Sequence, residues 1–359
     1  MLGKIVKVKI DRPINSIHPE HNDIIYKVNY GYVEGIFSLV DNEEIDAYII
    51  DVDYPISEYE GKVIAIIHRD GDEDKLIVAN KNVSKEEIYN KTYFAEKYFN
   101  SHIEMAITSK EDIIFDLKLN GFKSTDNLML HSSLKSFGNI IGQDIIDAFI
   151  EYINEGLVML PTHTWSFMKN DEQVLDLNEA NSCVGALTNI ALKTPGFKRS
   201  FHPTHSICAY GKDKEKYLAL DLNSKTPVDP NGCFGSLWKI GTKILFLGAP
   251  LSKITFVHSI EEEMNVNDRF TEHIYHFFSR DNDKTVEYYM PKHYSTKAEH
   301  LSEHYAKLLP EMLKKGIAQQ MYIGNSKTYC VDACKCREYV LYLLNKDIHI
   351  FDDYRKIED

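Results

Sequence analysis

Long apolar runs are missing from this chain of 359 residues. No stretch approaches the roughly 20 apolar residues that a membrane-spanning helix needs. The amino terminus, MLGKIVKVKIDRP, alternates charged and β-branched residues where a signal peptide has an apolar core. Basic residues are also in deficit, with 41 Lys and Arg against 54 Asp and Glu, and the formal net charge of -13 repels a phosphate backbone. We therefore expect a cytoplasmic protein that binds neither membranes nor nucleic acid.

Cysteine is scarce as well, with six residues in the chain. The last three form a C-x3-C-x-C cluster, which lacks the paired C-x2-C spacing of structural zinc sites. We interpret the cysteines as reduced thiols, with metal binding as the alternative for the cluster. Hydrophobic residues make up 43% and charged residues 26% of the chain, which is typical of globular proteins and excludes disorder. The length predicts two domains, because a single hydrophobic core stops growing before this size.

The first part of the chain has the pattern of a small β-barrel or sheet. Residues 5–79 contain short β-branched runs, VKVKI, IDAYIID, KVIAIIHR and DKLIVA, separated by turn residues. Ser84 and Glu87 then form a capping box, which predicts the start of a helix.

The remainder of the chain alternates strands with helices. A capping box at Thr108 and Glu111 is followed by the apolar runs NLMLH, LVMLP, HSICAY and KILFLG, with helical patterns over 142–155 and 184–193. This pattern predicts an α/β architecture. Because the composition changes near residues 100–107, we expect a β-barrel domain over 1–104 and an α/β domain over 105–359.

Two acidic turns in the first domain suggest a metal site. Residues 41–46, DNEEID, bring together Asp41, Glu43 and Asp46, and the next acidic turn contains Asp72 and Asp74. Dense oxygen ligands of this kind suit Mg²⁺. A solvated acidic surface is the alternative, because charge runs often serve only that purpose.

These turns lie in a longer pattern of short motifs. IDRPINSIHP, YKVNYGYVEG, DNEEIDAYII, GKVIAIIHRD, EDKLIVAN and FAEKYF resemble, in order and spacing, family I soluble inorganic pyrophosphatases over residues 9–99. The resemblance implies that Mg²⁺ is bound by five carboxylates: Asp41, Glu43, Asp46, Asp72 and Asp74. Few cations accompany them, because the segment between Asp11 and Tyr26 is short, so we expect weak or absent hydrolysis. A working pyrophosphatase domain and a barrel with only a structural or binding role both remain open.

The second domain begins with a polar strand-to-helix turn. The run LMLHSSLKSFG ends an apolar strand in His131, Ser132, Ser133 and Lys135. Hydroxyls and free amides at such a turn can hold a phosphate or pantetheine group, and an ordinary helix cap is the alternative. In the next strand, LVMLPTHTWSF, Pro161 ends the ladder and turns Trp165 outward, where it can wall a sugar ring or merely pack.

Two later runs contain candidate bases. In RSFHPTHSICAYG, His202 precedes Pro203, and the strand that follows contains Ser206. The run KILFLGAPLSKITFVHSIEEEM predicts a helix on which His258, Glu261 and Glu262 share one face. A histidine beside carboxylates can be oriented as a general base, and a surface ion pair is the alternative.

The four runs together resemble a known enzyme family. HSSLKSFG, VMLPTHTW, VGALTNIALKTPGFKRSFHPTHSICAYG and FGSLWKIGTKILFLGAPLSKITFVHSIEEE, in this order from about residue 107 onward, are similar to the antibiotic N-acetyltransferases, the aminoglycoside 3-N-acetyltransferases. The resemblance implies an α/β/α fold and direct transfer of the acetyl group of acetyl-CoA to the 3-amino group of deoxystreptamine or to a related amino sugar. The acceptor is thus a small-molecule amine.

The resemblance also implies roles for individual residues. His202 is the expected base, and His258 and Glu261 orient it or bind the substrate. Residues expected to contact acetyl-CoA are His131, Ser132, Ser133 and Lys135, and those expected to contact the acceptor are Trp165, Ser206 and Glu262. We interpret the stretch with His273 and His276 and the basic run 292–307 as an amphipathic insertion with a helical face. The sequence predicts no oligomeric state.

Overall fold

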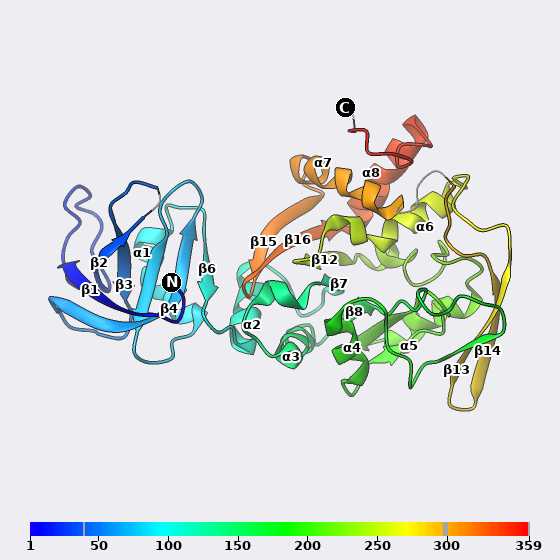
Figure 1. Cartoon of the computed structure of the whole chain (residues 1–359), viewed down its shortest axis with the longest axis horizontal. Helices are drawn as coiled ribbons and strands as arrows, with labels where there is room; N and C mark the ends of the chain where they lie inside the picture. The colour runs from blue at the N-terminus through cyan, green and yellow to red at the C-terminus, as the bar shows by residue number, and fades with distance from the viewer. Residues whose placement is uncertain (39, 297–300, 358–359) are drawn as a thin grey trace. The chain divides into compact units, whose positions relative to one another are not determined.

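The computed structural model describes residues 1–38, 40–296 and 301–357 (Figure 1). Its backbone divides into two compact units. Unit 1 is Met1–Leu119 with Phe137–Ile140, and unit 2 is Asn120–Ser136 with the chain from Ile141 onward. The domain boundary expected between residues 104 and 105 stays a prediction, because compactness of the backbone does not show which segment folds independently.

Unit 1 is a small β-barrel with one added strand. Five strands follow the order β1-β2-β3-β5-β4, pairing of β1 with β4 closes the barrel, and β6 extends β4. All neighbours are antiparallel except β3 and β5. The strands are β1 (Ile5–Arg12), β2 (Asn29–Phe37), β3 (Glu44–Ile49), β4 (Glu58–Arg69), β5 (Lys75–Ala79) and β6 (Ser101–Met105). The expected barrel is confirmed.

Alternate residues of the barrel strands belong to two different apolar clusters, because side chains alternate between the two faces of a strand. Along β5, Leu76 and Val78 belong to one buried cluster together with Val8 of β1, whereas Ile77 belongs to a second cluster with Ile88 of helix α1 (Lys85–Glu96). Ser84 caps this helix, as its capping box predicts, because its side chain accepts from the Glu87 N–H at 3.2 Å. Helix α2 (Lys110–Leu119) ends the first stretch of unit 1.

Unit 2 is built on a seven-stranded sheet with the order β10-β11-β8-β7-β12-β16-β15. Strands β7, β8 and β12 are parallel, and the outer pairs are antiparallel. The strands are β7 (Asn127–Ser132), β8 (Leu157–Pro161), β10 (Lys198–Arg199), β11 (Ile207–Gly211), β12 (Lys243–Leu247), β15 (Ala318–Ile323) and β16 (Ser326–Asp332).

Helices cover this sheet through apolar contacts. One core cluster joins Met129, Met159 and Phe246 of the central strands to apolar residues of α5, α6, α7 and α8. In Figure 1, α7 and α8 lie beside β15 and β16. The helices are α3 (Gly142–Tyr152), α4 (Ala186–Lys193), α5 (Lys214–Leu218), α6 (Thr255–Glu263), α7 (Leu308–Lys314) and α8 (Ala333–Lys346). Unit 2 is therefore the mixed α/β domain that the sequence predicts.

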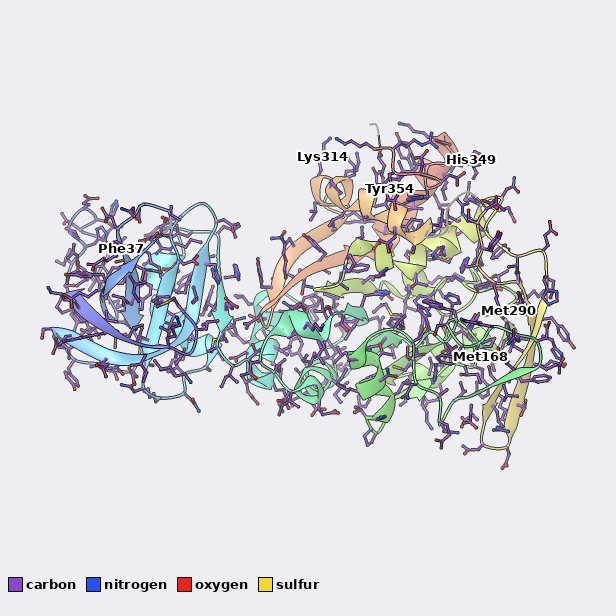
Figure 2. All side chains as sticks on the ribbon, in the orientation of Figure 1. Phe37, Met168, Met290, Lys314, His349 and Tyr354 are labelled. Carbon is purple, nitrogen blue, oxygen red and sulfur yellow. The ribbon has the colours of Figure 1, made fainter. Side chains whose placement is uncertain are left out.

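A separate three-stranded sheet lies where we expected a helical insertion. Strands β13 (Tyr275–Asp281) and β14 (Lys284–Met290) form an antiparallel hairpin, and β9 (Gln173–Asp176) pairs parallel to β13. Its small core contains Met168 and Met290, which are labelled in Figure 2. Phe277 belongs to the same core. The helical interpretation of the His273 and His276 segment is wrong, because the apolar side chains there alternate with period two and bury one face of a hairpin.

In the part of the chain that the structure describes, no helix combines the length and the apolar character needed to cross a bilayer.

Candidate active site

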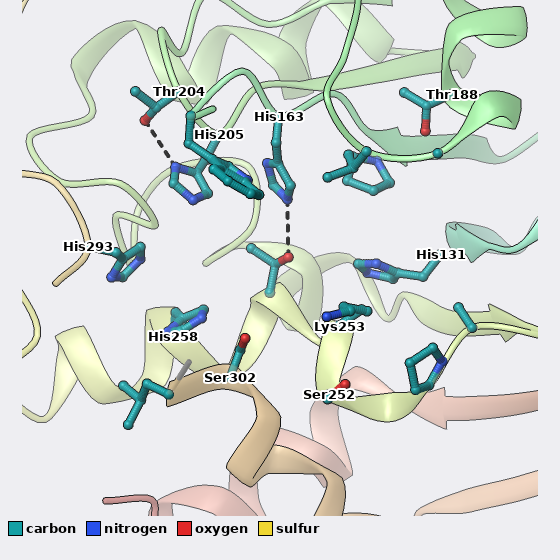
Figure 3. A pocket seen from close by; sticks show the side chains of 18 of the residues that line it. His131, His163, Thr188, Thr204, His205, Ser252, Lys253, His258, His293 and Ser302 are labelled. Carbon is teal, nitrogen blue, oxygen red and sulfur yellow. Dashed lines mark hydrogen bonds between the residues drawn. The ribbon is translucent and has the colours of Figure 1, made fainter. Parts of the chain in front are cut away.

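A cavity of about 690 Å³ lies in unit 2 at the carboxyl ends of β7, β8 and β12 (Figure 3). Open α/β sheets commonly bind ligands at this edge. β7 brings His131 and Ser132 to the cavity, and β8 ends at Pro161, which is followed by His163. The chain after β12 passes through Lys253 into α6. The polar residues that follow or end three parallel strands thus line the same cavity.

Helix α6 presents polar side chains to the cavity, because residues three apart lie on one helix face. Thr255 and His258 both line the cavity, and Thr255 Oγ1 lies 3.2 Å from His163 Nε2. Glu261, one turn further along, is only 1% exposed, and its Oε2 lies 3.6 Å from His258 Nδ1. The helix therefore exposes a histidine and buries the carboxylate beside it.

A chain of polar contacts links His258 to buried charges. The Tyr305 hydroxyl lies 2.8 Å from His258 Nδ1 and donates to Glu261. Glu261 pairs with Arg269 at 2.8 Å, and Arg269 also pairs with Asp352 at 2.8 Å. Because the single Tyr305 hydroxyl proton goes to Glu261, the Tyr305 oxygen accepts from His258 Nδ1–H. The lone pair of neutral His258 therefore lies on Nε2.

The surroundings keep Glu261 ionised. Burial alone would raise the pKa of this carboxyl, but the contacts with His258, Arg269 and Tyr305 hold the pKa below its usual value. Burial raises the pKa of Tyr305 well above its usual value, so Tyr305 keeps its hydroxyl proton. A carboxylate behind the imidazole stabilises the imidazolium that forms when Nε2 takes a proton.

Four further histidines line the cavity: His131, His163, His205 and His293. The ring of His293 lies 4.4 Å from that of His258, centroid to centroid, and 5.4 Å from that of His205. Burial lowers the pKa of all four, that of His131 to about 4. At neutral pH they therefore supply hydrogen-bond donors and acceptors, and no charge.

His202, the expected base, lies outside the lining of this cavity and is 2% exposed. Its Nε2 donates to the Thr226 carbonyl at 3.0 Å. Its Nδ1 accepts from the backbone N–H groups of Thr204 at 3.2 Å and His205 at 2.9 Å. Both ring nitrogens are thus hydrogen-bonded to backbone groups, and neither presents a lone pair to the cavity.

The residues expected to contact the acceptor are divided. Trp165 lines the cavity and is half-exposed. Ser206 is fully buried, where its hydroxyl accepts from Arg199 Nε at 3.0 Å and donates to the Thr162 carbonyl at 2.9 Å. The roles that the sequence analysis gives to these residues stay predictions.

Glu262 lies behind the lining residue His293, with its Oε1 3.5 Å from His293 Nε2, and holds a loop. Its carboxyl accepts from the Thr226 hydroxyl at 2.5 Å and from the Val228 N–H at 3.0 Å. Burial raises the pKa of Glu262 to about 8, so this group is mostly protonated at neutral pH. The residue therefore offers no carboxylate to a cationic acceptor.

Among the residues expected to contact acetyl-CoA, His131, Ser132 and Ser133 line the cavity, and Lys135 is exposed outside its lining. Helix α4 reaches the cavity beside them, through its amino-terminal residue Gly185 at φ 74°. No side chain caps this helix end, so its first N–H groups stay available to a ligand oxygen.

Tyr305, Arg269 and His293 are site residues that the sequence analysis missed. Tyr305 and His293 belong to the segment that we interpreted as a helical insertion. No local pattern relates Tyr305 to His258, which lies 47 residues earlier in the chain. Only the packing of η5 (Leu301–Lys307) within unit 2 brings this hydroxyl to the imidazole.

The acidic residues expected to bind Mg²⁺ in unit 1 do not converge. Asp46 accepts from the Tyr30 hydroxyl and pairs with Lys75 Nζ at 2.7 Å. Asp41 accepts from the backbone N–H of Glu43 at 3.0 Å, in an exposed turn. The first acidic turn therefore has an internal ammonium group where a metal ion was expected.

The carboxylates of the second acidic turn are also bonded to side chains of the same unit. Asp72 pairs with Arg69 at 3.2 Å, and Asp74 Oδ2 lies 2.9 Å from His68 Nδ1. Within residues 1–38, 40–296 and 301–357, no three His, Cys, Asp or Glu side chains are grouped to hold a metal ion. No pyrophosphatase family model matches this unit. The magnesium site and the pyrophosphatase resemblance are thus not supported, because the carboxylates do not converge and two of them, Asp46 and Asp72, pair with Lys75 and Arg69.

Comparison with known proteins decides the family of unit 2. The family model described as aminoglycoside 3-N-acetyltransferase matches residues 129–345, more than half of the chain. The chain belongs to this family.

The relatives are distant. The aminoglycoside N(3')-acetyltransferase-like protein YokD of a Bacillus subtilis prophage is 26% identical over 181 residues, which cover 43% of this chain and 64% of the relative. Aminoglycoside N(3)-acetyltransferase VII of Streptomyces paromomycinus is 27% identical over 166 residues, 41% of this chain and 57% of the relative. The chain thus spans less than two thirds of these two relatives. A third, acetyltransferase IX of Micromonospora chalcea, is 26% identical over 260 residues, covering 63% of this chain and 89% of the relative.

Solved structures have the same fold. A binary complex of AAC-IIIb with CoASH has a TM-score of 0.58 at 21% identity, over 67% of this chain and 97% of that chain. A mutant of AAC(3)-IVa in complex with gentamicin has a TM-score of 0.56 at 20% identity, over 68% and 91%. At such identities the likeness establishes the fold alone.

Proposed function

We propose that unit 2 transfers the acetyl group of acetyl-CoA directly to an amine, either the 3-amino group of an aminoglycoside or an amino group of a related amino sugar. The observation that carries this proposal is the histidine at the cavity, His258, whose Nε2 lone pair is open while Nδ1 is held through Tyr305 to buried Glu261. Family membership and the names of the relatives support the same class of reaction.

The chemistry needs a base. An amine is protonated at neutral pH, so a proton must leave before the nitrogen can attack a thioester. We assign this role to His258, which takes the proton at Nε2 while Tyr305 and ionised Glu261 stabilise the imidazolium at Nδ1. His202, the base expected from the sequence, instead accepts from the backbone N–H groups of Thr204 and His205, which line the cavity, and so helps to position its wall.

The same cavity fits acetyl-CoA along a second wall. In Figure 3, His131 and Thr188 lie on one side of the cavity, away from His293. The uncapped start of α4, the helix that contains Thr188, offers N–H groups to carbonyl or phosphate oxygens, and the lining residues Pro161 and Val184 offer apolar surface to a pantetheine arm. When bound, acetyl-CoA supplies the acetyl group as a thioester.

The test is release of free CoA thiol from acetyl-CoA by the purified chain. The acceptor panel contains aminoglycosides with and without a 3-amino group, and simple amino sugars. Release that depends on the amine, with a new N-acetyl group in the product by mass spectrometry, is the expected result. Absence of release with every amine, from protein that still binds acetyl-CoA, would contradict the proposal.

A further inference from the structure

The lysine and arginine side chains that line the cavity have no acidic counterpart in the described lining. None of its described lining residues is Asp or Glu, whereas Lys253, Arg269 and Lys292 all line it. The lining histidines other than His258 have lowered pKa values and are neutral at pH 7. The site therefore contains cations but no exposed carboxylate within the described part of the chain.

Two of these three cations are already neutralised. Arg269 is bound between Glu261 and Asp352, at 2.8 Å from each. Lys253 pairs with Glu303 at 2.8 Å. Both side chains therefore already have a carboxylate partner within the chain.

Lys292 is different. Its Nζ donates to the Lys169 carbonyl and lies 3.7 Å from the centroid of the Tyr275 ring. The structure shows no ion pair between Lys292 and any described Asp or Glu. A neutral carbonyl and an aromatic face orient the ammonium group, and Asp171 attracts it without forming an ion pair. An anion from outside the chain is the partner that this position lacks.

Lys292 adjoins a residue on the His258 side of the cavity. Its neighbour in sequence is His293, whose ring packs 4.4 Å from that of His258. Figure 3 shows His258 and His293 together, away from His131 and Thr188 on the wall assigned to acetyl-CoA. Lys292 thus lines the same cavity as the base and adjoins, in sequence, a residue whose ring packs against it.

A polycationic acceptor fits this arrangement poorly. An aminoglycoside carries several ammonium groups, and each one that leaves water needs a carboxylate or a similar partner. The aromatic ring of Trp165 can accept one cation, but the described lining offers no carboxylate for the others.

Resting on the acetyl transfer proposed above, we propose that the acceptor carries a carboxylate or phosphate group beside the amine that is acetylated, and that Lys292 binds this anionic group. The substrate class is then an acidic amino sugar or a similar anionic amine. Lys292 determines acceptor specificity, and His258 performs the proton transfer.

The experiment compares matched acceptors on the full chain. Binding to the protein saturated with CoA is measured by titration calorimetry for glucosamine, glucosamine 6-phosphate, muramic acid and sisomicin. Thiol release from acetyl-CoA is measured with the same four amines. We expect at least one anionic amine to bind about tenfold or more tightly than glucosamine, on the typical strength of a hydrogen bond between charged groups. Phosphate and carboxylate are separated by the two anionic probes.

Variants connect the preference to Lys292. Lys292→Ala should remove the preference for the anionic amine, Lys292→Arg should retain it within about threefold, and Lys292→Glu should reverse it in favour of sisomicin. CoA affinity should stay unchanged in all three. Lys212→Ala, at an exposed lysine away from the cavity, is the matched control and should behave as the unmodified chain.

Three results would overturn the inference. One is tighter binding of sisomicin than of both anionic amines by the unmodified chain. Another is failure of both anionic amines to bind better than glucosamine. The third is a fall in CoA affinity on Lys292→Ala with acceptor binding unchanged, which would assign Lys292 to the phosphates of CoA. Failure of the transferase proposal looks different: thiol release is then absent with every amine, whatever their order of binding.

Discussion

Both units contain ionisable side chains near strand ends, but the two sets differ in whether they have partners within the chain. In unit 1 the carboxylate Asp46 is paired with buried Lys75, and Asp74 is bound to His68. In unit 2 the cavity retains an open nitrogen on His258 and an ammonium group, Lys292, without a carboxylate partner among the described residues. The first set is closed on itself, and the second is open to a ligand.

The difference shows what separates a packing network from a binding site. A cluster of like charges in the sequence indicates a metal or ligand site only if the fold supplies no counter-ions to it. In unit 1 the counter-ions come from neighbouring strands. Substitutions in the closed networks should therefore lower stability, whereas substitutions at the open groups should lower acetyl transfer.

The largest effect is expected from comparing two histidines of unit 2. His258→Ala should lower kcat for acetyl transfer by about a hundredfold or more, because it removes the general base. His202→Ala should instead lower the melting temperature, because three backbone contacts lose their partner. Thiol release and thermal unfolding of both variants check this. A hundredfold loss of kcat in folded His202→Ala protein, with His258→Ala active, would reverse the two assignments.

The next effect concerns pH. Burial raises the pKa of Glu262 to about 8, so the folded chain binds this proton more tightly than the unfolded chain does. The resulting stability is complete below the unfolded pKa of about 4.3 and is lost as the pH rises toward 8. Glu262→Gln lacks this titration but keeps an acceptor for Thr226.

The measurement is urea unfolding followed by tryptophan fluorescence, since both tryptophans, Trp165 and Trp238, belong to unit 2. Between pH 5.5 and 7.5 the unmodified chain should lose more free energy of unfolding than Glu262→Gln, by up to about 1.4 kcal/mol per pH unit. Parallel pH dependences of the two proteins would refute the assignment of the protonated carboxyl.

A smaller effect is expected in unit 1. Asp46→Asn removes one of two carboxylates, with Glu73, that pair with Lys75, a side chain that is 4% exposed, and should lower the free energy of unfolding of this unit by about 1–2 kcal/mol. Since unit 1 has no tryptophan, the loss should alter far-UV circular dichroism and leave fluorescence unfolding in place.

Asp41→Asn is the control for this experiment, because Asp41 is exposed and bonded only to a turn N–H. Its effect should stay within about 0.5 kcal/mol. Acetyl transfer should be unchanged in both variants. Equal losses at the two positions would show that the buried pair contributes nothing beyond an ordinary surface contact.

The smallest effect tests the link behind the base. Tyr305→Phe removes the hydroxyl between His258 Nδ1 and Glu261, whereas the carboxylate stays within 3.6 Å of the ring. We expect kcat to fall about tenfold with little change in KM, because the imidazolium loses one stabilising contact. Tyr289→Phe, which removes an exposed hydroxyl bonded to Glu287, is the control. An unchanged kcat in Tyr305→Phe would show that the carboxylate acts alone.

Much of the fold could be predicted from local patterns. The β-branched runs of unit 1, the cap at Ser84 and the alternation of strands and helices in unit 2 depend on neighbours within a few residues, and all are confirmed. The hairpin of β13 and β14 was missed, because its aromatic and charged residues also fit a helical face.

The candidate site, too, could be predicted from the sequence only in part. Sequence spacing alone places His258 and Glu261 one turn apart on a helix, and it relates this chain to its family through ordered motifs. Only the tertiary structure shows that His202 is occupied by backbone groups and that Tyr305 bridges the pair. It also shows that Lys75 compensates Asp46. The physical reason is that hydrogen bonds and ion pairs depend on distances of about 3 Å between groups far apart in the chain, which no local spacing specifies.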